Sequence, residues 1–124
     1  MKTGAELIAE ERKRQIEIEG FTAESDLRYK NGELFYAGCC YHSAAKLRES
    51  GCDPGTPPTN WPFSTEYWKP SPDNRVKEII KSGALLQAHV DLTGSDLAIE
   101  MIKVCSREID ELLKVQRRKY IKGF

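Results

Sequence analysis

The sequence lacks long hydrophobic runs, a net charge and any sustained alternation of polar and apolar residues. Its apolar stretches cover only a few residues, far below a membrane span, and the opening MKTGAELIAEERKRQ has no apolar region of the kind found in signal peptides. Nineteen basic residues balance nineteen acidic ones, so no overall field draws the chain to nucleic acid or to an anionic membrane. We therefore expect a cytoplasmic protein whose recognition is local, with neither membrane nor nucleic acid as its partner.

A paired-cysteine motif is also missing. The four cysteines, at positions 39, 40, 52 and 105, form no CxxC pair, and a disulfide framework is not expected in a reducing compartment. Cys39, His42, Cys52 and His89 would supply four zinc ligands, but they are scattered over three segments. We therefore interpret the cysteines as buried, reduced thiols.

The absence of alternation, together with helical periodicity, predicts an all-α protein. Thr3 and Glu6 form a capping-box pattern, Asn31 is a candidate N-cap, a third helix should begin near Pro72 or Asp73, and Ser95 should cap a fourth. We expect one domain over residues 1–124, a four-helix bundle that associates as a homodimer or homotetramer. The expected helices cover about residues 3–19, 31–50, 73–92 and 95–118.

A long loop should separate the second and third helices, because all six prolines lie between residues 54 and 72. The same loop holds NWPFSTEYWKP, which carries Trp61, Phe63, Tyr67 and Trp68. Disordered segments are poor in aromatic residues, so we expect an ordered loop. Two interpretations stay open: the rings form a small satellite core, or they bind a ligand.

Three carboxylates, Glu11, Glu33 and Asp91, lie at or beside positions that the helical period assigns to the interior. Buried carboxylates need a partner, and carboxylates from several helices can together hold a hard divalent cation such as Mg²⁺. The alternative is that each lies at the rim of its helix, solvated or paired with a nearby cation.

Cations and tryptophans complete a candidate ligand site. Lys69, Arg75 and Lys81 would neutralise phosphates while Trp61 or Trp68 stacks on a base. The alternatives are that the cations are solvated surface residues and that the rings only anchor the loop.

The order of these segments resembles the short, phage-associated branch of the MazG-like all-α nucleotide pyrophosphohydrolases, of the dATP/dGTP diphosphohydrolase type. The resemblance rests on four stretches: IAEERKRQIEIEGFTAESD, NGELFYAGCCY, WPFSTEYWKPS and RVKEIIKSGALLQAHVD. It covers about residues 7–92, and the pairing of the WP…WKP loop with KxGAL is its most specific part. Membership of that branch would place the protein in the cytoplasm of a host cell.

The resemblance implies Mg²⁺- or Mn²⁺-dependent hydrolysis of a (deoxy)nucleoside triphosphate, with a purine favoured, to the monophosphate and pyrophosphate. By position, it implies that Glu11 and Glu33 bind the metal and that Asp26 and Asp91 are further acidic members of the site. It also places Gln15, from the ERxRQ motif, among the substrate-binding residues.

One departure from the pattern opens a second hypothesis. His89 stands where the family has an acidic residue, and imidazole is a poor ligand for Mg²⁺. Asp91 then suffices, or the metal preference has moved, or the protein binds a nucleotide or a nucleotide-derived signal without hydrolysing it. Glu108 and Asp110 are possible replacements from the last helix.

A third hypothesis is a helical interaction protein that docks through its basic C-terminal tail. After Glu111 the chain has no further acid, and its cations are Lys114, Arg117, Arg118, Lys119 and Lys122. The simpler interpretation of this tail is a solvated helix end.

Overall fold

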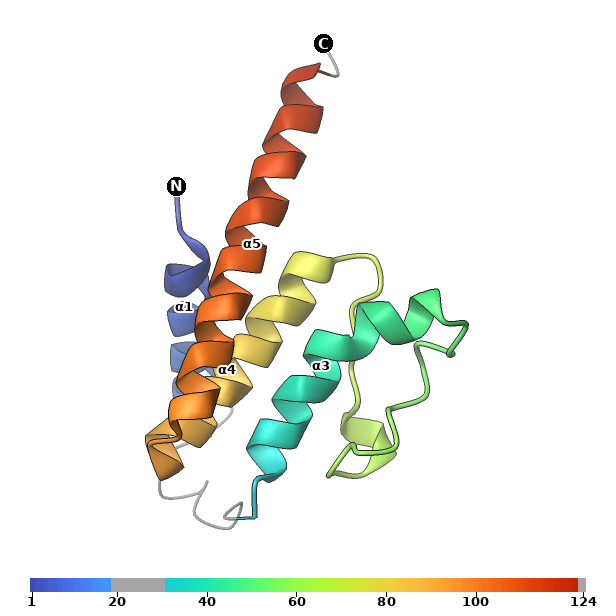
Figure 1. Ribbon diagram of the computed structural model, residues 1–124, viewed down its shortest axis with the longest axis vertical. Coiled ribbons are helices and arrows are strands. Elements are labelled where there is room, and N and C mark those ends of the chain that lie inside the picture. Colours follow the sequence, from blue (N-terminus) through green and yellow to red (C-terminus); the bar gives the residue numbers. More distant parts are fainter. Residues whose placement is uncertain (19–30, 123–124) are drawn as a thin grey trace.

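The computed structural model describes residues 1–18 and 31–122, the last three by their backbone alone, and within these ranges it contains helices and no strand. Figure 1 shows α1 and α4 descending and α3 and α5 ascending, and its labels are used below. The all-α bundle expected from the sequence is confirmed. The described elements are α1 (Gly4–Glu17), α3 (Glu33–Glu49), the 3-10 turn η2 (Thr65–Tyr67), α4 (Arg75–Thr93) and α5 (Asp96–Lys122).

Helix α4 forms the centre of the bundle. It packs against α3 on one side and against α1 and α5 on the other (Figure 1). One apolar cluster joins α3, α4 and the loop between them, residues 50–74, which is called the aromatic loop below. A second cluster joins α1, α4 and α5. Its buried residues therefore surround most of the helix: Val76, Glu78, Ile79, Ser82, Gly83, Ala84, Leu85, Leu86 and Ala88.

Small residues let the helices approach closely. A Cβ added at Gly38 would lie 2.9 Å from Leu86 Cγ and 3.1 Å from the carbonyl oxygen of Ser82, so only glycine fits between α3 and α4. A Cβ added at Gly83 would lie 2.6 Å from Ile8 Cδ1, where α1 crosses α4. These contacts set the spacing of the helices.

Two predicted helix starts are wrong, and two caps are confirmed. Asn31 is not the N-cap of α3: Gly32 takes that position with a φ of 86°, a left-handed conformation that glycine adopts without strain. Helix α4 starts at Arg75, later than expected, because the side chain of Asn74 caps the backbone N–H of Lys77. The capping box at Thr3 and the cap at Ser95 are confirmed.

Helix ends differ by a few residues from the expected ones. Helix α1 ends at Glu17, and α5 continues to Lys122 because no residue that disfavours helix intervenes before Gly123. The outer part of α5 extends past the other helices (Figure 1), and its residues 114–119 are exposed. Among residues 1–18 and 31–122, no helix has both the length and the apolar character required to cross a membrane.

Candidate functional site

Glu11 lies on α1 and is bound by a neighbouring cation. Its carboxylate accepts hydrogen bonds from Nε and Nη2 of Arg14, one turn later, and its side chain is 16% exposed. Because Arg14 is partly exposed, this pair is near solvent, where an ion pair contributes little stability. Glu11 can therefore exchange Arg14 for another cation at modest cost.

Asp91 is held more firmly, near the end of α4. One carboxylate oxygen accepts from Arg12 Nε at 3.2 Å, and the other accepts from Gln87 Nε2 at 2.9 Å. Arg12 is only 5% exposed, so Asp91 compensates a buried positive charge between α1 and α4. Both oxygens of Asp91 are occupied by donors from the protein itself.

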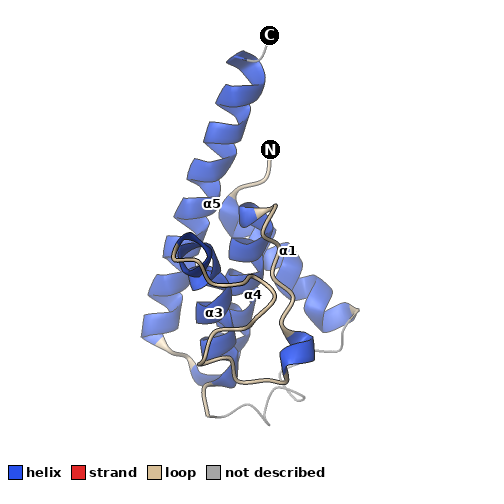
Figure 2. Cartoon of the chain, turned by 90° about the vertical axis from the view of Figure 1, so that its right-hand side faces the viewer, coloured by secondary structure: helices blue, strands red, loops and turns tan. Residues whose placement is uncertain are grey.

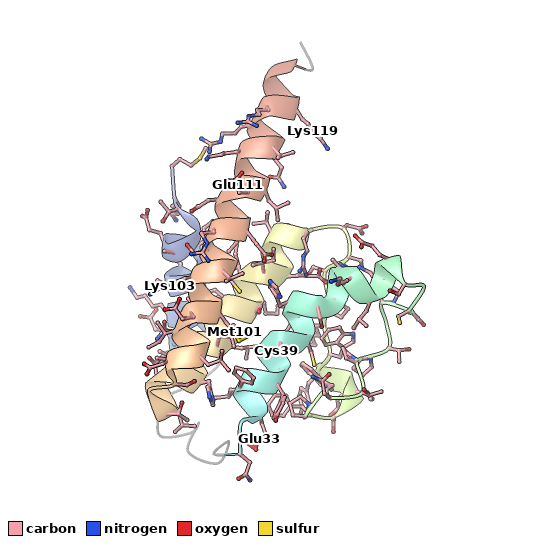
Figure 3. All side chains as sticks on the ribbon, in the orientation of Figure 1. Glu33, Cys39, Met101, Lys103, Glu111 and Lys119 are labelled. Atoms are coloured by element: carbon pink, nitrogen blue, oxygen red, sulfur yellow. The ribbon has the colours of Figure 1, made fainter. Side chains whose placement is uncertain are left out.

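Glu33, in the first turn of α3, forms no ion pair or side-chain hydrogen bond with any other described residue. Figure 3 shows Glu33 at the lower end of the molecule, where α3 begins, and the residue is half-buried. A carboxylate at a helix N-terminus is stabilised by the helix dipole, and its oxygens remain available to a cation.

The described residues meet the requirements of a metal site only in part. In residues 1–18 and 31–122 no three acidic, histidine or cysteine side chains come together in a group that could hold a metal ion. Glu33 is available and Glu11 is weakly held, whereas Asp91 is engaged by Arg12. Asp26, the fourth residue expected from the sequence, lies outside the described residues.

Two buried polar atoms on α1 and α4 have no hydrogen-bond partner within the described part of the chain. They are Oε1 of Gln15, a residue only 4% exposed, and Nδ1 of His89. Burial lowers the pKa of His89, whose ring lies 5.4 Å from that of Phe35, so the imidazole is neutral at pH 7. Unsatisfied buried polar groups are costly and are common at binding sites.

The aromatic loop is ordered and packs across α3 (Figure 2). Trp68 is 7% exposed, stacks on Tyr41 with ring centroids 4.7 Å apart, and donates its indole N–H to the carbonyl of Pro54. Trp61 packs edge-on against both rings but is only partly buried, and Tyr67 is 62% exposed. Trp68 therefore anchors the loop, and Trp61 is the tryptophan with surface left for a ligand.

The three candidate phosphate-binding cations have different surroundings. Lys69 is exposed on the loop. Lys81 Nζ donates to the carbonyl of Lys69 and lies 5.0 Å from the ring centroid of Tyr41. Arg75 donates to the main-chain carbonyls of Tyr41 and His42, so its guanidinium holds α3 against α4. Lys69 is the cation that faces solvent.

The structure also reveals a buried carboxylate that sequence reasoning missed. Glu78 is 1% exposed and accepts hydrogen bonds from Arg48, Arg75 and the backbone N–H of Ser71. Burial alone would raise the pKa of Glu78, but these donors hold it below its ordinary value. The available signal was its place between Val76 and Ile79, three residues after an arginine.

The acidic residues of α5 have partners of their own. Glu108 accepts from Nε2 of His42 on α3 at 2.9 Å, and Asp110 accepts from the backbone N–H of Gly4 at 2.7 Å. Asp110 thereby binds the N-terminus of α1, as a capping carboxylate does. Neither residue pairs with Glu33, and the neighbouring Glu111 lies far above Glu33 in Figure 3.

Comparisons of the chain with protein-family models, with curated proteins and with solved structures found no match. The functional conclusions below therefore rest on the residues of this chain and on the arrangement of their side chains.

Proposed function

We propose that this protein hydrolyses a nucleoside triphosphate, with a purine deoxynucleotide as the favoured substrate, to the monophosphate and pyrophosphate in the presence of Mg²⁺ or Mn²⁺. The observation that carries the proposal is the position of Glu33. Its carboxylate, which no other described residue binds, lies at the end of the bundle where α1 and α4 end and α3 begins (Figures 1 and 3). The motifs quoted above support the same reaction.

Other side chains near this end support a nucleotide as the ligand. The 3-10 turn η2 lies beside the N-terminal half of α3 (Figure 1), and Trp61 packs there with part of its ring exposed. An exposed indole face binds a base by stacking. The buried amide oxygen of Gln15 has no hydrogen-bond partner among the described residues, and Lys69 is exposed, so its ammonium is accessible to a phosphate.

Glu33 and Glu11 are the described residues that would hold a divalent cation, together with Asp26 as the sequence predicts. A bound cation supplies charge neutralisation on the phosphate oxygens and activation of the attacking water. Asp91 then acts indirectly: it keeps the buried guanidinium of Arg12 neutralised, and so fixes α1 against α4 beside Glu11.

The test is a panel of nucleoside and deoxynucleoside triphosphates incubated with purified protein and each metal, with the products identified by chromatography. We expect pyrophosphate and monophosphate from at least one nucleotide, and no product from Glu33→Gln. Glu49→Gln is the matched control, because Glu49 is an exposed carboxylate at the opposite end of the same helix. Failure of the wild-type protein to release pyrophosphate from any nucleotide with either metal would refute the proposal.

A second candidate function is nucleotide binding without hydrolysis, and the surroundings of Asp91 favour it. Both of its oxygens are occupied by Arg12 and Gln87, and no group of three metal-binding side chains exists in the described ranges. The second function predicts stoichiometric binding without metal and recovery of the intact ligand. Recovery of monophosphate would exclude it.

A further inference from the structure

Glu78 is the centre of a buried charged network near the start of α4. Its Oε1 and Oε2 lie 2.6 and 2.9 Å from the two terminal nitrogens of Arg48 at the end of α3. Oε1 also accepts from Arg75 at 3.3 Å, and Oε2 accepts from the backbone N–H of Ser71 at 3.0 Å. A carboxylate that is 1% exposed requires such donors, because desolvation otherwise disfavours its charged form.

The network continues into the aromatic loop through Tyr41. Arg75 donates to the carbonyl of Tyr41 at 2.9 Å, and the Tyr41 hydroxyl accepts the backbone N–H of Lys69 at 3.0 Å. The Tyr41 ring stacks on Trp68 at 4.7 Å with an interplanar angle of 19°. Arg75, Tyr41 and the loop thus form one connected set of contacts around Glu78.

The contacts around Glu78 hold the main chain of residues 69–71, the part of the loop that leads into α4. Backbone groups of Ser71 and Lys69 are held by Glu78, by Tyr41 and by the ammonium of Lys81. Main-chain bonds of this kind fix a loop before a ligand arrives, so that binding costs less conformational entropy. An apolar residue at position 78 would fill the same core space, but it would leave the Ser71 N–H without its acceptor.

We propose that Glu78 is a positioning residue for ligand binding, which holds the loop so that Trp61 and Lys69 face the ligand. The inference rests on the proposed nucleotide-binding role of the loop. Glu78 precedes Asp91 by thirteen residues of α4, which is about 20 Å along the helix axis. It therefore acts through the loop and not by contact with the reacting atoms.

The experiment uses Glu78→Gln, which keeps the shape of the side chain and removes its charge. Trp61 and Trp68 are the only tryptophans of the chain and both lie in the loop, so acrylamide quenching of intrinsic fluorescence reports the loop directly. We expect faster quenching, a helical far-UV spectrum that is unchanged, and a KM for the nucleotide raised by about tenfold with kcat unchanged. A residue with a merely structural role would change stability without this separation of KM from kcat.

A second variant is needed because removal of one charge from a buried pair is strongly destabilising. Tyr41→Phe keeps the stacked ring and the ion pairs but loses the hydroxyl that accepts from Lys69. We expect it to raise KM and quenching in the same direction. Glu100→Gln, which changes an exposed carboxylate on α5 that pairs with Lys103, is the control and should change neither quantity.

The outcomes separate this inference from the proposed function. If the wild-type protein is active and both variants keep the wild-type KM and quenching, the positioning role is refuted and the proposed function stands. If kcat falls while KM is unchanged, the positioning role is also refuted. A wild-type protein that neither binds nor hydrolyses any nucleotide refutes both.

Discussion

Replacement of Gly38 by alanine tests whether direct contact between α3 and α4 sets the packing of the bundle. The added Cβ would lie 2.9 Å from Leu86 Cγ, 3.1 Å from the carbonyl oxygen of Ser82 and 3.2 Å from Leu86 Cδ2. Leu86 is fully buried, and Ser82 O belongs to the backbone of α4, so neither can move aside without a shift of the helix. The two helices must therefore separate to accept one methyl group.

Two opposing effects determine the size of the change. Alanine is better than glycine inside a helix by about 1 kcal/mol. Overpacking of a close-packed core costs about 1–3 kcal/mol, and a backbone obstacle favours the upper part of that range. We expect Gly38→Ala to lower the free energy of unfolding by about 1–2 kcal/mol, or the melting temperature by roughly 4–8 °C.

Chemical denaturation followed by far-UV circular dichroism measures this change, and a double-mutant cycle assigns its cause. Leu86→Ala removes the side-chain obstacle at the cost of a cavity, so in that background Gly38→Ala should be less destabilising by about 1 kcal/mol or more. A Gly38→Ala protein as stable as the wild type would refute the close-contact argument. Equal effects in both backgrounds would show that the clash with Leu86 is not the cause.

Three further predictions concern single side chains. The pKa of Glu78 is held below its ordinary value of 4.5, so the unfolded chain takes up the proton first as the pH falls. The stability that this carboxylate contributes is therefore present above pH 4.5 and is lost as the pH falls from that value towards the folded pKa. Denaturation measured at a series of pH values should show this loss for the wild-type protein and not for Glu78→Gln. Asp110→Ala removes the acceptor for the Gly4 N–H and should cost about 1 kcal/mol in thermal unfolding, against no change if the bond contributes nothing. Cys52 is exposed whereas burial raises the pKa of Cys105 to about 11, so a thiol reagent should label Cys52 in the folded protein and Cys105 only after unfolding, as peptide mapping can check.

Helix existence was predictable from the sequence because periodicity and caps are local signals. Thr3 and Ser95 were identified from their side chains alone, and the structure confirms both caps. The start of α3 was missed because Asn31 has a capping side chain, yet Gly32, in a left-handed backbone conformation, is the N-cap. Both Asn31 and Gly32 are suitable N-cap residues, so residue type alone does not decide between them.

The interior was predicted less well because each helix meets neighbours on more than one side. Near the end of α1 the apolar Ile18 is 74% exposed, whereas the charged Arg12 is only 5% exposed. Arg12 and Glu78 are buried because each finds a partner on another segment, Asp91 in one case and Arg48 in the other. Such long-range pairs leave no periodic trace in the sequence.

The loop shows how far residue type alone carries a prediction of function. Trp68 is buried against Tyr41, as a satellite core requires, whereas Trp61 and Tyr67 retain exposed surface, and ligand binding by these rings stays a prediction. The nucleotide ligand, the metal and the association into dimers or tetramers stay predictions. The experiments on Glu33 and Glu78 address the first two.

The directions of the outer helices determine how the protein can be attached to other molecules. Helix α1 begins, and α5 finishes, at the end of the bundle opposite Glu33 (Figures 1 and 3). A purification tag, a surface linker or a fused fluorescent reporter joined at either terminus therefore stands away from Glu33. Protein immobilised through either terminus would present the Glu33 end of the bundle to solution. Binding can therefore be measured on a sensor surface with the protein attached first by one terminus and then by the other, and the two results should agree.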